Sequence, residues 1–208
     1  MGIAERKERE KREMRELIIR SAMDLFVDRG YEKTSIRAIA NAIDYSPATL
    51  YLYFKDKDEI FFAIQTKAFS QLFATMQPLL QIENPLERLK TLGRVYIKFA
   101  LDHPKYYDVM FIMESPMNAE KNQDKWEIGK QAHSFLETTV QQCVDQGLII
   151  PDKAEETAFL MWSTVHGMAS LLIKNRLKMY DCEVWGDYAD LMNASMAVLY
   201  KAIETKKE

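Results

Sequence analysis

Apolar residues recur at intervals of three and four along nearly all of this 208-residue chain. Two clear stripes are Leu17, Ile18, Ala22, Leu25 and Phe26, and Leu89, Leu92, Tyr96, Phe99 and Ala100. Alternating runs of β-branched residues, which are typical of half-buried strands, are absent. Only 7 glycines and 6 prolines interrupt the pattern. A spacing of 3.6 residues with so few breaks predicts an all-α fold.

Composition limits the class of protein further. Apolar residues make up 48% of the chain and charged residues 28%, which is ordinary for a globular protein that buries one large core or two modest ones. No apolar run reaches the roughly 18 residues that a membrane span needs. Two cysteines, Cys143 and Cys182, give neither a disulfide framework nor a zinc-binding spacing. We therefore expect a cytoplasmic protein without a membrane partner.

Charge by itself does not indicate a polyanionic partner. The net charge is −3, and acidic and basic residues balance over residues 1–60. Any argument for nucleic-acid binding must therefore depend on where individual side chains lie. Residues 4–16 alternate in charge with almost nothing apolar, so we expect a solvated helical extension that frays. A DNA-reaching arm is the alternative.

Breaks in the apolar pattern divide the chain into helices. Gly30 ends the first, and a long helix after Asp56 reaches Met76 or beyond. A helix opened by Asn84 and Pro85 ends at His103-Pro104. The remaining expected segments are a short aromatic helix at 105–113, a loop at 114–123, a helix from Trp126 to Gly147, a helix that Asp152 and Glu155 open, a break at 180–186 and a last helix that runs to the charged tail.

The stretch 34–61 contains three helix starts within one short region. They are marked by Thr34 or Ser35, by Ser46 with Pro47 in the first helical position, and by Asp56 with Glu59 in a pattern that resembles a capping box. Leu50 and Phe54 lie four apart and share the inward face. Two short helices joined by a tight turn, with one helix before and a long one behind, describe a helix-turn-helix.

The outward residues of this stretch are of the types that contact DNA. Arg37 lies on the outer side of the first short helix, and Pro47, Ala48, Thr49, Tyr51 and Tyr53 lie on the second. Hydroxyl and lysine side chains bind phosphates, while arginine and methyl-bearing side chains read base edges. Lys57 stands at the positive start of the long helix. A helical corner whose polar residues merely face water is the alternative.

The strings T-S-I-R-A-I-A and S-P-A-T-L-Y-L-Y-F-K-D-K-D-E-I-F closely resemble the DNA-binding domain of the tetracycline-repressor (TetR) family over residues 17–62. The resemblance implies a recognition helix at 46–53, core positions at Leu50 and Phe54, and a phosphate contact at Lys57. The DNA-binding residues that it implies are Thr34, Ser35, Arg37, Ser46, Pro47, Ala48, Thr49, Tyr51, Tyr53, Lys55 and Lys57. The sequence departs from the family pattern at two positions. Asp44 stands where the family usually has a turn glycine, and Ala48 replaces a common glycine of the recognition helix. Both differences bear on which operator sequence is bound and not on the fold.

The family resemblance also implies the organisation of the chain. Residues 1–16 are expected to form the charged extension, 17–62 the DNA-binding domain, and 63–208 a helical ligand-binding and dimerisation domain. Within the last, 162-WSTVHG-167 resembles the Trp-His-Gly (WHG) subfamily, with 103-HPKYYDVMF-111 as its companion segment. The helix 158–173 is apolar on all sides and must be covered on all sides, so one flank is expected to pack on a partner subunit. Gly167 would admit a close backbone approach.

Aromatic and methionine side chains concentrate on helices of this second region. A pocket for an apolar or aromatic effector is one interpretation, and plain core packing is the other. His166 fits a hydrogen-bonded structural histidine better than a ligand contact. The residues expected to bind the effector are Phe69, Phe73, Tyr96, Phe99, Tyr107, Met110, Phe111, Trp126, Trp162 and His166.

No nucleophile, acid–base pair, metal constellation or cofactor motif stands out, so we expect neither an enzyme nor a cofactor, and no catalytic residue or metal ligand is assigned. The sequence predicts a homodimeric transcriptional regulator that binds double-stranded operator DNA. The family resemblance favours a repressor that a small-molecule effector releases. A helical ligand-binding or adaptor protein without regulated DNA binding is the alternative.

Overall fold

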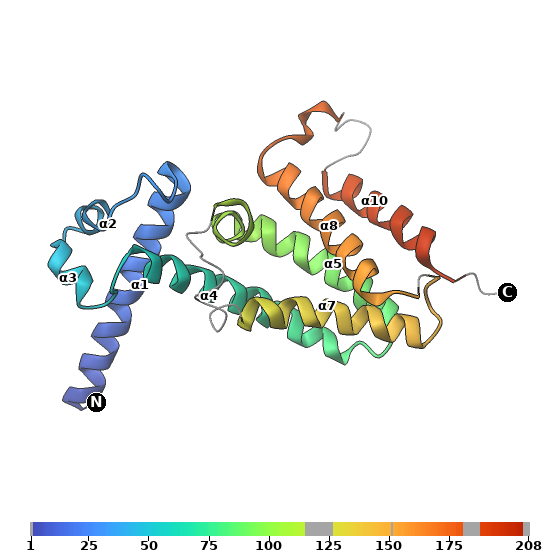
Figure 1. Cartoon of the computed structure of the whole chain (residues 1–208), viewed down its shortest axis with the longest axis horizontal. Coiled ribbons are helices and arrows are strands. Elements are labelled where there is room, and N and C mark those ends of the chain that lie inside the picture. Colours follow the sequence, from blue (N-terminus) through green and yellow to red (C-terminus); the bar gives the residue numbers. More distant parts are fainter. Residues whose placement is uncertain (1, 115–126, 151, 181–187, 206–208) are drawn as a thin grey trace. The chain divides into compact units, whose positions relative to one another are not determined.

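The computed structural model describes residues 2–114, 127–150, 152–180 and 188–205, and these form helices joined by short connections (Figure 1). The helices are α1 (Ile3–Arg29), α2 (Ile36–Ala42), α3 (Pro47–Tyr51), α4 (Lys57–Met76), η1 (Gln77–Gln81), α5 (Pro85–Asp102), α6 (Pro104–Tyr107), η2 (Asp108–Ile112), α7 (Glu127–Asp145), α8 (Ala154–Ile173), η5 (Leu177–Met179) and α10 (Tyr188–Ile203). The predicted all-α class is confirmed. The expected loop at 114–123 and break at 180–186 fall almost entirely outside the described residues.

The chain divides into two compact units by its internal contacts. One consists of Met1–Ser70 with Lys105–Glu127, and the other of Gln71–Pro104 with Ile128–Glu208. This division differs from the boundary expected at residues 62 and 63. The difference arises because α4 continues without a break past that point, and because the segment after α5 folds with the N-terminal unit.

The N-terminal unit has its core where α1, α2, α3 and α4 meet. The side chains of Phe26, Ile39, Leu50 and Phe61 are fully buried there. The rings of Phe26 and Phe61 lie 5.7 Å apart, a distance typical of packed aromatic pairs. Phe26, Ile39 and Leu50 come from the apolar faces that the helical spacing predicts.

Helix α1 begins at Ile3, so the charged residues 4–16 are helical, as expected, and they continue without a break into the apolar stripe. Ion pairs four residues apart, Arg6 with Glu10 and Arg9 with Glu13, lie on its exposed surface. Such pairs each stabilise a helix by about 0.2–0.5 kcal/mol. Glu16 also pairs with Lys67 of α4, which connects this part of α1 to the core.

The segment 105–113 was expected to form one short aromatic helix, and it forms α6 followed by the single π-helical turn η2. It belongs to the N-terminal unit because it packs against α1 and α4. Tyr107 and Val109 are fully buried, the carbonyl of Val109 accepts from the Gln65 amide at 3.2 Å, and Lys105 pairs with Asp24 at 2.7 Å.

The C-terminal unit contains α5, α7, α8 and α10, with α5 packed along α8. Asn84 caps α5 by accepting from the amides of Leu86 and Glu87, as its position before Pro85 predicts. Arg88 is buried, and its guanidinium donates to the Ile82 carbonyl. The start of α8 differs from expectation, because Lys153 occupies the N-cap position without a side-chain cap and Asp152 does not cap it.

Candidate nucleic-acid interface and effector site

The helix-turn-helix is built from short-range contacts that the sequence specifies. Ser35 caps α2 by accepting from the Ala38 amide at 3.1 Å, and Ser46 caps α3 by accepting from the Thr49 amide at 3.2 Å. Between the helices, Asp44 has a φ of 60°, in the left-handed region that aspartate tolerates better than most residues. The turn thus forms without the glycine that is common there in the family.

The next helix start also follows the prediction. Asp56 accepts from the Glu59 amide at 2.8 Å, so it caps α4. In a standard capping box the Glu59 side chain would accept from the backbone amide of the N-cap residue, Asp56. Here it accepts instead from the amide of Lys55, one residue earlier, at 2.6 Å. The connection between α3 and α4 is thereby held at both ends.

Helix α3 presents one side to the core and the other to solvent. Leu50 and Phe54 are buried, as predicted, whereas Ala48, Tyr51 and Lys55 are exposed. Tyr51 is 57% exposed, so more than half of its surface is accessible to water. Of the remaining residues expected at DNA, Ser35, Arg37 and Ser46 are exposed, and Pro47, Thr49 and Tyr53 are half-buried.

Thr34 is a correction to the expected DNA-binding set. Only 2% of Thr34 is exposed, and its hydroxyl lies within hydrogen-bond distance of the carbonyls of Gly30 and Leu25, at 2.9 and 3.2 Å. The side chain therefore ties the end of α1 to the start of α2. A buried hydroxyl with these partners is not available to a phosphate, so we omit Thr34 from the proposed interface.

Lys57 has an intramolecular role that the sequence does not reveal. Its ammonium donates to the Tyr31 carbonyl at 2.9 Å and lies 3.8 Å from the centroid of the Tyr31 ring. The Tyr31 hydroxyl in turn donates to Asp58, and burial raises the pKa of Tyr31 well above its usual value. The expected phosphate contact of Lys57 stays a prediction, because such a contact would compete with these partners.

Two exposed residues at the same surface were not among the expected contacts. Tyr45, in the turn before α3, is 41% exposed, and Leu52, directly after α3, is 77% exposed. Exposed large apolar side chains next to a recognition helix are candidates for contact with thymine methyl groups or sugars. The sequence could have indicated the exposure of Leu52, because the helical period places it on the side opposite the buried Leu50.

The residues expected to bind the effector divide between the two units. Phe69, Tyr107, Met110 and Phe111 belong to the N-terminal unit, where Phe111 contacts both Phe69 and Tyr107 with ring centroids 5.5 and 5.2 Å apart. Those in the C-terminal unit are Phe73, Tyr96, Phe99, Trp162 and His166. Trp126 lies outside the described residues.

A polar contact crosses the core of the C-terminal unit. The Tyr96 hydroxyl lies 3.1 Å from Nδ1 of His166, so His166 is hydrogen-bonded as expected. The His166 ring lies 5.6 Å from the Trp162 ring, and Trp162 lies 6.2 Å from the ring of His133. Burial lowers the pKa of His166 below its usual value, which favours the neutral imidazole at pH 7.

Within the described ranges, the structure shows no cluster of three or more potential metal ligands. None of the described helices is long and apolar enough to cross a membrane.

A capped, solvent-facing α3 held against α1 and α4 by Leu50 and Phe54 defines a helix-turn-helix DNA-binding regulator. Residues 18–64 match the family model described as "Bacterial regulatory proteins, tetR family". Residues 89–196, more than half of the chain, match "Tetracyclin repressor-like, C-terminal domain". The chain belongs to the TetR family. The finer resemblance to the WHG subfamily stays a prediction.

Similar proteins agree with this assignment. The HTH-type transcriptional regulator TcmR of Streptomyces glaucescens is 31% identical over 94 residues, which span 43% of this chain and 42% of TcmR. The structure of the ketosteroid transcriptional regulator KstR2 of Mycobacterium tuberculosis matches with a TM-score of 0.72 at 20% identity, covering 93% of this chain and 96% of that one. The regulator PfmR from Thermus thermophilus matches with a TM-score of 0.71 at 20% identity over 91% and 96%. The two structures show the shared fold alone.

Proposed function

We propose that this protein is a dimeric transcriptional repressor that binds operator DNA through α3 and is released by a small apolar or aromatic effector. The observation that carries the DNA-binding part is the exposure of one side of α3 next to Arg37 of α2. The proposed interface consists of Ser35, Arg37, Ser46, Pro47, Ala48, Thr49, Tyr51, Tyr53, Lys55 and Lys57. It acts by binding rather than by catalysis, and DNA as the target implies a cytoplasmic site of action.

Exposed apolar residues on α8 and α10 support the dimer. Leu160 and Leu171 are 48% and 47% exposed, and Gly167 lies between them at helical spacing. A Cβ at Gly167 would meet no described atom within 4 Å beyond the adjacent backbone of its own helix. On α10, Val198 is 71% exposed. A second copy packed on these helices in a four-helix bundle would remove this apolar surface from water, and a two-fold axis would present two copies of α3 to two half-sites.

The effector proposal rests on the aromatic residues around Tyr96 and on the course of α4. That helix begins beside α3 in the N-terminal unit and ends in the C-terminal unit. A ligand that contacts Phe73 near the end of α4 and Tyr96 of α5 would favour one arrangement of α4 over another. The two recognition helices of a dimer would then change their spacing, and operator affinity would fall.

Operator binding and effector binding must be coupled reciprocally if this proposal is right. The operator is first selected from random duplexes. A panel of apolar and aromatic compounds is then titrated by calorimetry with and without that operator. We expect an effector to weaken operator binding and the operator to weaken effector binding by the same factor. The coupling typical of such systems is about 1–3 kcal/mol.

Single-residue variants test where the effector binds. Tyr96→Ala and Phe73→Ala are expected to lower effector affinity, while Tyr180→Ala, at an exposed tyrosine of the same unit, serves as the control. A tight ligand that binds equally with and without operator would show a binding protein that does not switch. Failure to retain any duplex in a sequence-specific manner would favour the alternative of a helical adaptor.

A further inference from the structure

A pocket of about 340 Å³ opens between α5 and α10 of the C-terminal unit, and none of the residues expected at the effector is among those that line it. Its volume is at the lower end of the roughly 300–1,000 Å³ typical of small-molecule sites. Arg94 lines it, whereas Tyr96 is two residues further along α5 and so about 200° around the helix. The pocket is therefore separate from the proposed effector site.

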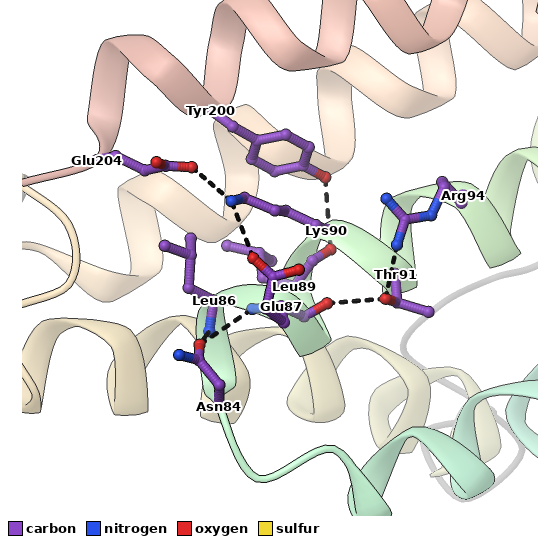
Figure 2. Close-up of polar contacts among 9 residues, drawn as sticks. All are labelled: Asn84, Leu86, Glu87, Leu89, Lys90, Thr91, Arg94, Tyr200 and Glu204. Carbon is purple, nitrogen blue, oxygen red and sulfur yellow. Dashed lines mark hydrogen bonds and ion pairs between the residues drawn. The ribbon is translucent and has the colours of Figure 1, made fainter.

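One end of the pocket carries an excess of positive charge. Lys90, Arg94 and Lys201 line it with one carboxylate, that of Glu204. Glu204 is already neutralised, because its oxygen lies 2.7 Å from the Lys90 ammonium. Figure 2 shows Lys90 reaching between Glu204 and Glu87, with Glu87 3.1 Å away. These two carboxylates raise the pKa of Lys90, so it stays charged at neutral pH.

Arg94 and Lys201 remain available to a ligand. Among the described residues, the polar partner of the Arg94 guanidinium is the Thr91 hydroxyl at 2.9 Å, and no carboxylate pairs with it (Figure 2). Lys201 is exposed and has no ion-pair partner in the described part of the chain. An arginine fork without a carboxylate partner at the mouth of a pocket is suited to an anion with two adjacent oxygens, such as a carboxylate or a phosphate.

The Tyr200 hydroxyl adds a neutral donor. Burial raises the pKa of Tyr200 to about 12, so the phenol keeps its proton. It donates to the Leu89 carbonyl over 3.4 Å, a long hydrogen bond that leaves room for a better acceptor. Gly93 makes this position possible, because a Cβ there would stand 2.8 Å from the Tyr200 oxygen.

The rest of the lining is apolar. Ile97 of α5 and Met196 and Ala197 of α10 line the pocket beside the polar groups. A methionine side chain adapts to ligands of different shape. The pocket therefore combines two available cations and a phenol with an apolar wall, which matches a molecule that has one anionic head and a short apolar body.

We propose that the pocket between α5 and α10 binds a small monocarboxylic acid, with the carboxylate on Arg94 and Lys201 and the apolar body on Ile97, Met196 and Ala197. The guanidinium fork can bind either a carboxylate or a phosphate. The carboxylate is favoured because a monocarboxylic acid has an apolar body for the apolar wall, which offers an inorganic phosphate no partner. The site is a second ligand site, beyond the effector proposed above.

The test uses the full chain and defined probes. Sodium benzoate and sodium octanoate are titrated by calorimetry and by methyl NMR of Met196, whose signal is assigned with Met196→Leu. Benzamide supplies the uncharged control and inorganic phosphate the second anion. We expect saturable binding of a carboxylate that shifts the Met196 methyl signal, and binding of benzamide and phosphate weaker by about tenfold or more.

Arg94→Met is expected to weaken carboxylate binding by about tenfold, since it removes the fork and keeps the apolar stem. Lys98→Met is the matched control, because it removes the same charge one turn further along α5, where Lys98 pairs with Asp102. Equal losses in the two variants, no saturable binding, or equal binding of phosphate or benzamide would each overturn the proposal. Operator binding measured in parallel keeps this result separate from the proposed function.

Discussion

Arg15 of α1 is hydrogen-bonded to Tyr53, which lies 38 residues further along the chain and two residues beyond the end of the recognition helix α3. The guanidinium donates to the Tyr53 carbonyl at 2.5 Å and lies 4.1 Å from the centroid of the adjacent Phe54 ring. Helix α3 is only five residues long and cannot hold its position through its own hydrogen bonds. The charged half of α1 therefore takes part in positioning the DNA-binding surface.

Replacing Arg15 by methionine is expected to destabilise the protein by about 1–2 kcal/mol, since a charge-assisted hydrogen bond and a cation–π contact are lost. Operator affinity should fall as well, because α3 is less firmly held. Arg12→Met, at an exposed position of the same helix, removes the same charge and is the control. Urea unfolding and operator titration measure the two effects. Equal losses of stability and of operator affinity in Arg15→Met and Arg12→Met would show that the contacts of Arg15 with Tyr53 and Phe54 contribute nothing beyond the positive charge.

Arg37 and Lys57 are expected to differ in how they affect DNA binding. Arg37→Ala should relax base preference at one position per half-site by roughly 1–3 kcal/mol, because an arginine fork reads guanine. Lys57→Ala should weaken all sequences about equally and flatten the salt dependence. Binding to a library of operator variants at several salt concentrations separates these outcomes. The same selectivity profile in both variants would refute the assignment of roles.

The contact of Lys57 with Tyr31 adds a prediction about stability. If the lysine acts mainly within the chain, Lys57→Met should lower the free energy of unfolding by about 1 kcal/mol. Lys55→Met, at an exposed neighbour, should leave it within about 0.5 kcal/mol of the wild type. Denaturant unfolding of the two variants measures this difference. A larger loss for Lys55→Met would contradict the role of the Tyr31 contact.

A charge on the exposed face of α8 or α10 is expected to separate the proposed dimer. Val198→Glu is the sharpest choice, because Val198 is 71% exposed, so the change should spare the monomer fold. Leu172→Glu and Leu199→Glu should act similarly, but both residues are half-buried and also stabilise their own unit. Leu80→Glu, at a leucine that is 59% exposed elsewhere, is the control. Sedimentation velocity measures the state, and a Val198→Glu monomer with undiminished operator affinity would exclude the dimer as the binding form.

Gly93 and Gly167 should respond in opposite ways to alanine. A Cβ at Gly93 would stand 2.8 Å from the Tyr200 hydroxyl, so Gly93→Ala is expected to cost about 1–3 kcal/mol. At Gly167 a Cβ would meet none of the described residues beyond the adjacent backbone of its own helix, so alanine should stabilise the helix by about 0.5–1 kcal/mol. Denaturant unfolding at high dilution, where the monomer is favoured, measures the stability of both variants. A rise in the dissociation constant of Gly167→Ala would place this glycine at the subunit contact.

His166 predicts a pH dependence of stability. Burial lowers its pKa below the usual 6.5, so between the two values the unfolded chain binds the proton more readily than the folded one. This contribution to stability is fully present above pH 6.5 and is lost as the pH falls through 6.5 toward the lower folded value. His166→Asn, which keeps a polar group near Tyr96, should reduce the change in unfolding free energy between pH 7.5 and 5.5. If the change in unfolding free energy between pH 7.5 and 5.5 is the same in His166→Asn as in the wild type, the pH dependence comes from other groups.

The sequence by itself determined the helical class and the helix starts at Ser46 and Asp56, and it limited the cap of α2 to Thr34 or Ser35. Each of these depends on residues within four positions of one another, so local spacing suffices to predict it. The buried positions of Leu50 and Phe54 follow for the same reason, since the helical period assigns a face before any partner is known.

Only the tertiary structure decided how distant residues are used. Thr34 is of a residue type that contacts phosphate, yet contacts with Gly30 and Leu25 bury it. The charge pattern places Arg15 in a solvated extension, although Tyr53 and Phe54 lie beside it. The pocket at Arg94 needs α10, about a hundred residues further along the chain. Such contacts depend on how helices pack, and the order of residues along one helix does not specify which other helix will cover it.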